Sequence, residues 1–100
     1  MKMVPIKIPA EYHSDVERAI AISKEEGCRE VYIFGSVAAG KPGPRSDLDI
    51  AVRGCPVEQF YRLLGRLMEE LNHPVDLVDL DVETGVAQYL EEEEQLIHVG

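Results

Sequence analysis

Two aspartates lie two residues apart in the segment DLDIAVR, and their spacing allows them to act together. Asp47 and Asp49 alternate with apolar residues in a pattern typical of a β-strand, so both carboxylates should leave the same face of that strand. Two negative charges held this close need compensation, and hard carboxylate oxygens suit Mg²⁺. A further aspartate, Asp76, lies within another predicted strand and can add a third carboxylate. Three carboxylates on adjoining strands are typical of sites that hold two metal ions for phosphoryl or nucleotidyl transfer.

The third carboxylate has two candidates in the segment VDLVDL. Asp76 and Asp79 face opposite ways on an alternating strand, so only one of them can join Asp47 and Asp49. We prefer Asp76 because it is internal to the apolar run, whereas Asp79 and Asp81 are typical of residues at a strand end.

A Gly-Ser pair directly after another predicted strand offers a place for phosphates. Gly35 lets the backbone approach a ligand closely, Ser36 offers a hydroxyl, and the amides that follow carry partial positive charge if a helix begins there. Lys41 and Arg45 flank this loop and can neutralise phosphate charge, although exposed loop charges are an equally good interpretation. A Gly-Ser turn and an Asp-x-Asp are each common alone, so the hypothesis depends on finding the two eleven residues apart.

The elements that position these residues follow from apolar periodicity. The segment SDVE has the form of a capping box, which predicts a helix over residues 14–26 that ends at Gly27. Strands are predicted over residues 29–34, 47–53, 75–80 and 95–99, a helix over residues 56–72, and a weaker helical segment over residues 82–94. This order, without repeats or a linker, predicts one α/β (α+β) domain of two layers over residues 1–100.

Charge is distributed unevenly along the chain. The formal net charge is -9, and residues 69–100 hold ten acidic residues and no Lys or Arg. This balance argues against a simple binder of the nucleic-acid backbone, and without a basic patch we expect the tyrosines to serve as packing groups. The acidic third has two interpretations, as solvated helix faces or as a surface that docks a basic protein.

Composition also indicates the compartment. The chain has no run of 18 apolar residues, its first residues lack the pattern of a signal peptide, and its two cysteines form no CxxC pair. The histidines show no metal-ligand spacing. We therefore expect a cytoplasmic protein that does not contact membranes.

The segment GSVAAGKPGPRSDLDIAV, residues 35–52, resembles the signature of nucleotidyltransferases with the DNA polymerase β-type fold, and within them the minimal nucleotidyltransferase (MNT) group. The family pattern is a Gly-Ser, a turn of small residues, Ser-Asp-x-Asp on a strand, and a third carboxylate downstream. The resemblance implies a small two-layer nucleotidyltransferase fold in which helices pack on one face of a mixed β-sheet.

The resemblance also implies a role for each matching residue. The residues implied to bind the nucleotide are Gly35, Ser36, Lys41, Arg45 and Ser46, and those implied to be catalytic and to hold two Mg²⁺ ions are Asp47, Asp49 and Asp76. The implied reaction is transfer of AMP from ATP to a hydroxyl group, with release of pyrophosphate.

The resemblance points to a partner protein as the acceptor. MNT proteins are commonly encoded with HEPN-domain partners and act as antitoxins of HEPN ribonuclease toxins by adenylylating a tyrosine on them. A chain of 100 residues has no room for an acceptor domain of its own, which favours a macromolecular acceptor. Two alternatives stay open: a non-catalytic antitoxin that masks its partner by contact, and a small-molecule nucleotidyltransferase that works with a partner subunit. Self-association is also left open.

One residue departs from the family pattern. Many MNT proteins read Gly-Ser-x-Ala-Arg-Gly, and this chain has Ala39 in place of that arginine. The substitution removes a guanidinium that would neutralise phosphate charge in the transition state, which weakens the case for catalysis. All three carboxylate positions are nevertheless filled.

Overall fold

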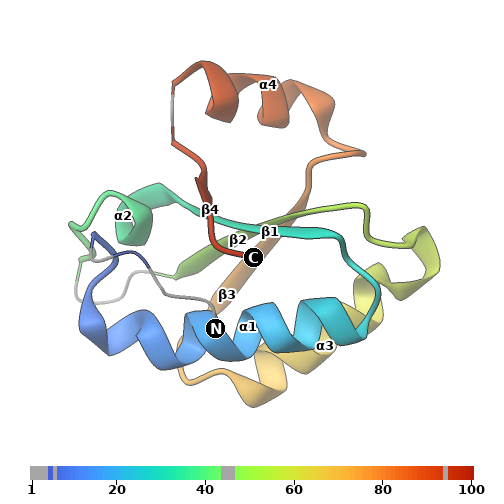
Figure 1. Cartoon of the computed structure of the whole chain (residues 1–100), viewed down its shortest axis with the longest axis horizontal. Helices are drawn as coiled ribbons and strands as arrows, with labels where there is room; N and C mark the ends of the chain where they lie inside the picture. The colour runs from blue at the N-terminus through green and yellow to red at the C-terminus, as the bar shows by residue number, and fades with distance from the viewer. Residues whose placement is uncertain (1–4, 6, 44–46, 94) are drawn as a thin grey trace.

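The computed structural model describes residues 5, 7–43, 47–93 and 95–100. Four helices, two 3₁₀ turns (η) and four strands follow one another within these residues (Figure 1). Their order is η1 (Ala10–Tyr12), α1 (His13–Glu25), β1 (Glu30–Phe34), α2 (Gly35–Ala38), β2 (Leu48–Arg53), η2 (Val57–Gln59), α3 (Phe60–Glu70), β3 (Val75–Asp79), α4 (Thr84–Glu92) and β4 (Ile97–His98).

The strands form one mixed sheet in the order β3-β2-β1-β4. β1 pairs with β2 and with β4 in antiparallel fashion, whereas β2 and β3 are parallel. A parallel pair needs a crossover that returns the chain to its starting edge, and α3 supplies it. The predicted fold class, an α/β domain with a mixed sheet, is confirmed.

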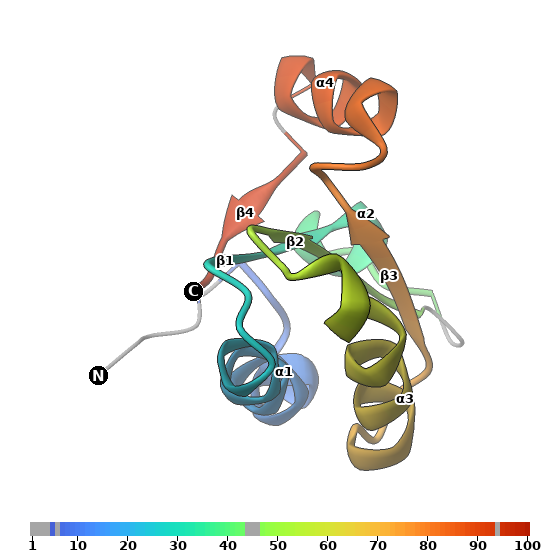
Figure 2. The same cartoon turned by 90° about the vertical axis from the view of Figure 1, so that its right-hand side faces the viewer.

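Alternation along the strands gives the sheet two different faces. Leu48, Ile50 and Val52 of β2 are fully buried in the main core, which α1 and α3 cover. Ala51 points the other way, into a smaller buried cluster with Leu80, Ala87 and Leu90, beneath α4. Figure 2 shows α1 and α3 on one side of the sheet and α4 on the other. Two helices thus pack on one face as implied by the resemblance, and α4 adds a partial cover to the second face.

The start of α1 differs from the sequence prediction. The predicted capping box is not used, because a 3₁₀ turn precedes the helix, the N-cap is Tyr12 and no side chain caps the helix. The end of the helix is confirmed: Gly27 has φ +95°, a left-handed conformation that glycine adopts without strain. No helix in the described part of the chain is long and apolar enough to cross a membrane.

The tyrosines divide into two pairs. Tyr12 is buried and Tyr32 is half-buried, as expected of packing groups. Tyr61 and Tyr89 are exposed, so the packing prediction is wrong for them.

Candidate functional site

The pairing of β2 with β3 brings two of the candidate aspartates side by side. Asp49 and Asp76 are partners in the parallel register, so their side chains leave the same face of the sheet on adjacent strands. Ala51 and Val78 share this face and lie in or against the α4 cluster. Asp49 is half-buried, and Asp76 and Asp47 are exposed.

The three carboxylates interact electrostatically. Burial, followed by the negative charges of Asp76 and Asp47, raises the pKa of Asp49 to about 6. None of the described Lys or Arg side chains forms a salt bridge with any of the three. The structure thus brings Asp49 and Asp76 together, with the charge of Asp47 felt at Asp49, and the described Lys and Arg residues place no salt-bridge partner among them.

Asp79 lies on the opposite face. It is buried, and together with Leu77 and residues at the start of α3 it lines a separate cavity. Its Oδ1 accepts a hydrogen bond from the backbone N–H of Asp81 at 2.9 Å. The geometry thus favours Asp76 over Asp79 as the neighbour of Asp49.

Gly35 packs directly against the Asp49 carboxylate. β1 ends at Phe34, which pairs with Asp49, and Gly35 then turns the chain into α2 with φ +74°. A Cβ at this position would overlap Oδ2 of Asp49 and lie 3.0 Å from its Cγ. A glycine is therefore required by space as well as by backbone conformation.

A cavity of about 440 Å³ adjoins this turn. It is lined by Gly35 and Ser36 together with Ala38 and Ala39 of the same turn, and by Lys7, Gln95 and Ile97. The chain folds back after α2, since the backbone N–H of Lys41 donates to the carbonyl of Ser36 at 3.0 Å. Lys41 itself is exposed and does not line the cavity. Arg45 and Ser46, which were also predicted to bind nucleotide, lie outside the described residues.

Sequence reasoning missed Lys7 and Gln95. Lys7 lies 28 residues before Gly35, and Gln95 lies 60 residues after it. The fold alone brings them to the cavity, and no local motif marks them. Lys7 supplies the positive charge that the short Gly-Ser segment lacks.

The donor set fits magnesium only together with a phosphate ligand. Within the described residues, no group of three His, Cys, Asp or Glu side chains lies close enough to hold an ion unaided. Mg²⁺ in proteins is commonly held by one or two carboxylates plus substrate phosphates and water. The adjacent Asp49 and Asp76 match that requirement, and the raised pKa of Asp49 shows a local excess of negative charge that a cation would relieve.

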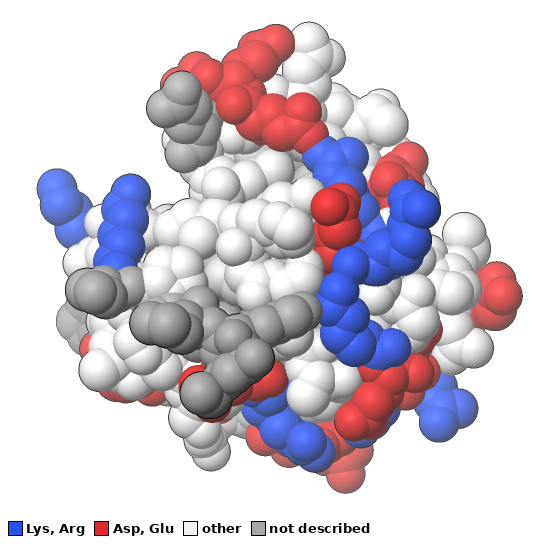
Figure 3. Space-filling view, in the orientation of Figure 1, with Lys and Arg blue, Asp and Glu red and all other residues white. Residues whose placement is uncertain are grey.

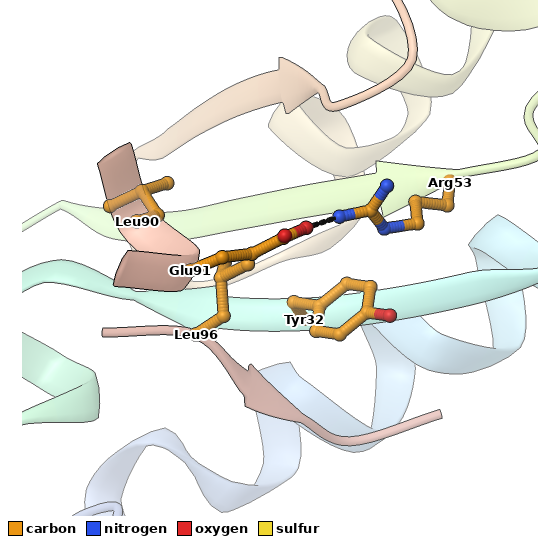
Figure 4. Close-up of a pocket in the computed structure, with 5 residues that line it drawn as sticks. All are labelled: Tyr32, Arg53, Leu90, Glu91 and Leu96. Atoms are coloured by element: carbon orange, nitrogen blue, oxygen red, sulfur yellow. Dashed lines mark hydrogen bonds and ion pairs between the residues drawn. The ribbon is translucent and has the colours of Figure 1, made fainter. Parts of the chain in front are cut away.

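A second cavity, of about 300 Å³, lies between α4 and the sheet (Figure 4). Its lining residues are Tyr32, Arg53, Leu90, Glu91 and Leu96. An ion pair between Arg53 and Glu91 crosses it, and the guanidinium carbon of Arg53 lies 5.9 Å from the ring centre of Tyr32. Its charges are thus paired internally, which makes it a less suitable nucleotide site than the region around Gly35.

Acidic side chains gather over α4, with basic side chains bordering them (Figure 3). Some of the acidic residues in the last third of the chain have partners within the fold. These pairs include Glu70 with Arg18 and Arg66, Asp81 with the N–H of Gly54, Glu91 with Arg53, and Glu92 with Gln88. Solvation and local pairing thus account for part of this acidity.

Comparison with known proteins finds one matching family model and several similar solved structures. The family model described as polymerase beta, nucleotidyltransferase matches residues 17–98. A crystal structure of a toxin-antitoxin with AMP-PNP has a chain 27% identical to this one, with a TM-score of 0.70 over 84% of this chain and 71% of that chain. A protein proposed to be a minimal nucleotidyltransferase is 30% identical, with a TM-score of 0.67 over 87% of this chain and 91% of that chain.

A third likeness shows the fold alone. It is to a complex of tri-AMPylated Shewanella oneidensis HEPN toxin with MNT antitoxin, at 24% identity and a TM-score of 0.64 over 87% of this chain and 70% of that chain. Comparison with the sequences of curated proteins gives no match.

Proposed function

Because the chain belongs to the polymerase beta nucleotidyltransferase family, we propose that it transfers AMP from ATP to a hydroxyl group of a partner protein. The observation that carries the proposal is the pairing of Asp49 with Asp76 on one sheet face beside the Gly35 turn, with Asp47 near enough for its charge to raise the pKa of Asp49. An acidic cluster next to a glycine turn and a cavity suits a nucleoside triphosphate with its cations.

In the proposed reaction, the acceptor hydroxyl oxygen attacks the α-phosphorus of ATP. A new P–O bond forms to the acceptor, the bond to the β-phosphate breaks, and pyrophosphate leaves with that electron pair. The hydroxyl proton passes to a carboxylate of the cluster. Asp49 and Asp76, together with the triphosphate, would hold Mg²⁺, which would supply charge neutralisation.

The chain's own residues hold and orient the reactants. Asp49 and Asp76 are fixed by the parallel strand pair, so their oxygens are positioned before the ligand arrives. Gly35 leaves room for the Asp49 carboxylate beside the turn, and Lys7 offers a positive charge at the cavity that Gly35 and Ser36 line. Ala39 supplies no guanidinium at this cavity, so Lys7 and Lys41 take on greater importance in neutralising phosphate charge.

The proposed acceptor is a tyrosine of a HEPN-domain toxin, with this chain acting as its antitoxin. Similar structures support this assignment: one is a toxin-antitoxin with AMP-PNP, and another contains an AMPylated HEPN toxin with its MNT antitoxin. The described fold has no additional domain around the carboxylate cluster, so an acceptor presented by a partner protein fits the open site.

The test is a transfer assay with ATP labelled at the α-phosphate, Mg²⁺ and the protein encoded by the adjacent gene. We expect label on that protein, and loss of labelling in Asp47→Asn and Asp49→Asn. Glu69→Gln is the matched control, because Glu69 is an exposed acid on α3, away from the cluster. Labelling that survives Asp49→Asn would overturn the assignment.

A second function is favoured by one observation, the alanine at position 39. If the partner is inhibited stoichiometrically without becoming labelled, and the Asp49→Asn variant inhibits equally well, the chain is a masking antitoxin. Pyrophosphate release that depends on an added aminoglycoside would instead indicate a small-molecule acceptor.

A further inference from the structure

A groove separate from the carboxylate cluster lies between the start of α3 and the loop from β3 to α4. Its cavity has a volume of about 360 Å³, and its walls are mostly aromatic and aliphatic side chains: Val57, Phe60, Tyr61, Leu77 and Val82. Val57 is 74% exposed, Tyr61 81% and Val82 65%. Large apolar side chains that gather around an exposed cavity are typical of an interaction site.

A buried carboxylate lines the same groove. Asp79 is only 6% exposed, and its Oδ1 accepts a hydrogen bond from the backbone N–H of Asp81. None of the described Lys or Arg side chains forms a salt bridge with it. Removing a carboxylate from water without a cationic partner is unfavourable, so this position favours the arrival of a positive charge.

Nearby arginines already have other partners. On α3, Arg62 and Arg66 both form salt bridges with Glu26, and Arg53 at the end of β2 pairs with Glu91. The negative charge of Asp79 therefore stays available to a group from outside the chain.

We propose that this groove receives an arginine side chain of a partner protein, with the apolar residues that flank the arginine lying against Val57, Tyr61 and Val82. A guanidinium can bind a carboxylate through two hydrogen bonds and stack on an aromatic ring, and the groove offers both Asp79 and the rings of Phe60 and Tyr61. The charge of the last third of the chain adds attraction for a basic partner.

The groove is independent of the nucleotide site. Asp79 and Leu77 face α3, whereas Asp49 and Asp76 face the side of the sheet that carries α4. α3 and β3 lie side by side in Figure 2, and the groove lies at their α4-proximal end. A partner bound here leaves the carboxylate cluster uncovered, and the proposal holds whether or not the chain transfers AMP.

The test is an NMR titration of the ¹⁵N-labelled full chain with the acetylated, amidated peptide Ala-Leu-Arg-Leu-Ala. The matched probe replaces arginine by citrulline, which keeps the shape and removes the charge. We expect amide shifts at Val57, Tyr61, Asp79 and Val82, and about tenfold weaker binding of the citrulline peptide. The proposal would be overturned if the two peptides bind equally well or if the shifts map to other residues. It would also be overturned if about 10 mM peptide causes no shifts, because one such contact should have a dissociation constant of about 1 mM.

Two variants locate the interaction. Asp79→Asn keeps an oxygen to accept the Asp81 amide but removes the charge, and we expect it to abolish the difference between the two peptides. Tyr61→Ala truncates an exposed side chain, so it tests the groove even if Asp79→Asn unfolds the protein. Tyr89→Ala is the matched control, an exposed tyrosine on α4 outside the groove. Unchanged arginine-peptide affinity in a folded Tyr61→Ala variant, or equal losses in Tyr61→Ala and Tyr89→Ala, would contradict the assignment.

Discussion

The Asp49 carboxylate fills the space that a side chain at Gly35 would need. The last residue of β1 pairs with Asp49, and the next residue, Gly35, turns with φ +74°. The glycine turn and the aspartate strand are therefore one structural unit, although Gly35 and Asp49 are 14 positions apart in the chain. A change at either position should affect the other.

Gly35→Ala should weaken ATP binding and lower the free energy of unfolding by about 1–3 kcal/mol, because the new methyl group displaces the carboxylate and the left-handed backbone is strained. Gly65→Ala is the matched control, since nothing lies within 4 Å of a Cβ there and the site is within α3. In urea unfolding, that control should gain about 0.5–1 kcal/mol from helix propensity. Equal effects of the two substitutions would contradict the role of the Gly35–Asp49 contact.

Asp49→Asn should stabilise the ligand-free protein at neutral pH while abolishing transfer. Burial and the charges of Asp76 and Asp47 raise the pKa of Asp49 to about 6, above the ordinary value of about 3.9. The folded state therefore holds more protons between these two values, and its stability falls as pH rises through the interval. We therefore expect the free energy of unfolding of Asp49→Asn to exceed that of the parent by about 1–2 kcal/mol. This figure is smaller than the full pKa shift would give, because Asp49 is partly exposed and solvent screens its charge.

Urea unfolding at two pH values checks this expectation. The variant should be more stable than the parent at about pH 7.5, with little difference near pH 3, where the parent carboxyl is largely protonated in both states. A variant that is less stable at neutral pH would show that the Asp49 charge is compensated within the fold.

Asp76→Asn should weaken Mg²⁺-dependent binding of ATP by about tenfold or more, because it removes a charged oxygen beside Asp49. Calorimetric titration with ATP in the presence and absence of Mg²⁺ measures the effect, with Glu69→Gln as the control. A greater loss in Asp79→Asn than in Asp76→Asn would mean that the third carboxylate is Asp79.

Asp15→Asn should destabilise the protein at neutral pH by about 1–3 kcal/mol. Burial alone would raise the pKa of Asp15, but hydrogen bonds from the backbone N–H groups of Asn72 and His73 and from the His73 ring outweigh it and lower the pKa. A lowered folded-state pKa gives stability that is present above the unfolded value and is lost as pH falls through the folded value.

Thermal or urea unfolding across acidic pH measures this contribution. The difference between Asp15→Asn and the parent should be largest above about pH 5 and should shrink below about pH 3. A difference that does not change with pH would assign the effect to shape and hydrogen bonding rather than to the charge.

Ala39→Arg should strengthen ATP binding and speed transfer, by about tenfold in rate for one added phosphate-facing guanidinium. Ala39 is exposed and lines the cavity beside Gly35 and Ser36, so the longer side chain has space. Ala39→Gln is the control for size without charge. No gain over Ala39→Gln would show that Lys7 or other residues already supply the required charge.

The sequence predicted the strands and the aspartate cluster because both follow from local alternation. Asp49 and Asp76 leave the same face as expected once β2 and β3 are parallel neighbours. Residues that depend on distant packing escaped the prediction. Lys7 reaches the cavity only through the path of the N-terminal segment, and the bond between Asp15 and His73 joins positions 58 residues apart.

The sequence also mispredicted how α1 begins. The SDVE segment matches a capping box, yet the helix begins at His13 because a preceding 3₁₀ turn already provides its first hydrogen bonds. Ser14 and Asp15 are consequently inside the helix, where Asp15 turns to the segment after α3 instead of capping its own helix. Tertiary contacts decided the role of this residue.

The unequal cover of the two sheet faces separates stability from access. The layer under α1 and α3 contains most of the buried apolar side chains among the described residues, whereas α4 is held by only a few, including Ala87 and Leu90. Detaching α4 therefore costs less than unfolding the molecule. The face that carries Asp49 and Asp76 can thus become more accessible to a large acceptor. The strands that align these two residues meanwhile stay packed against α1 and α3 on the other face.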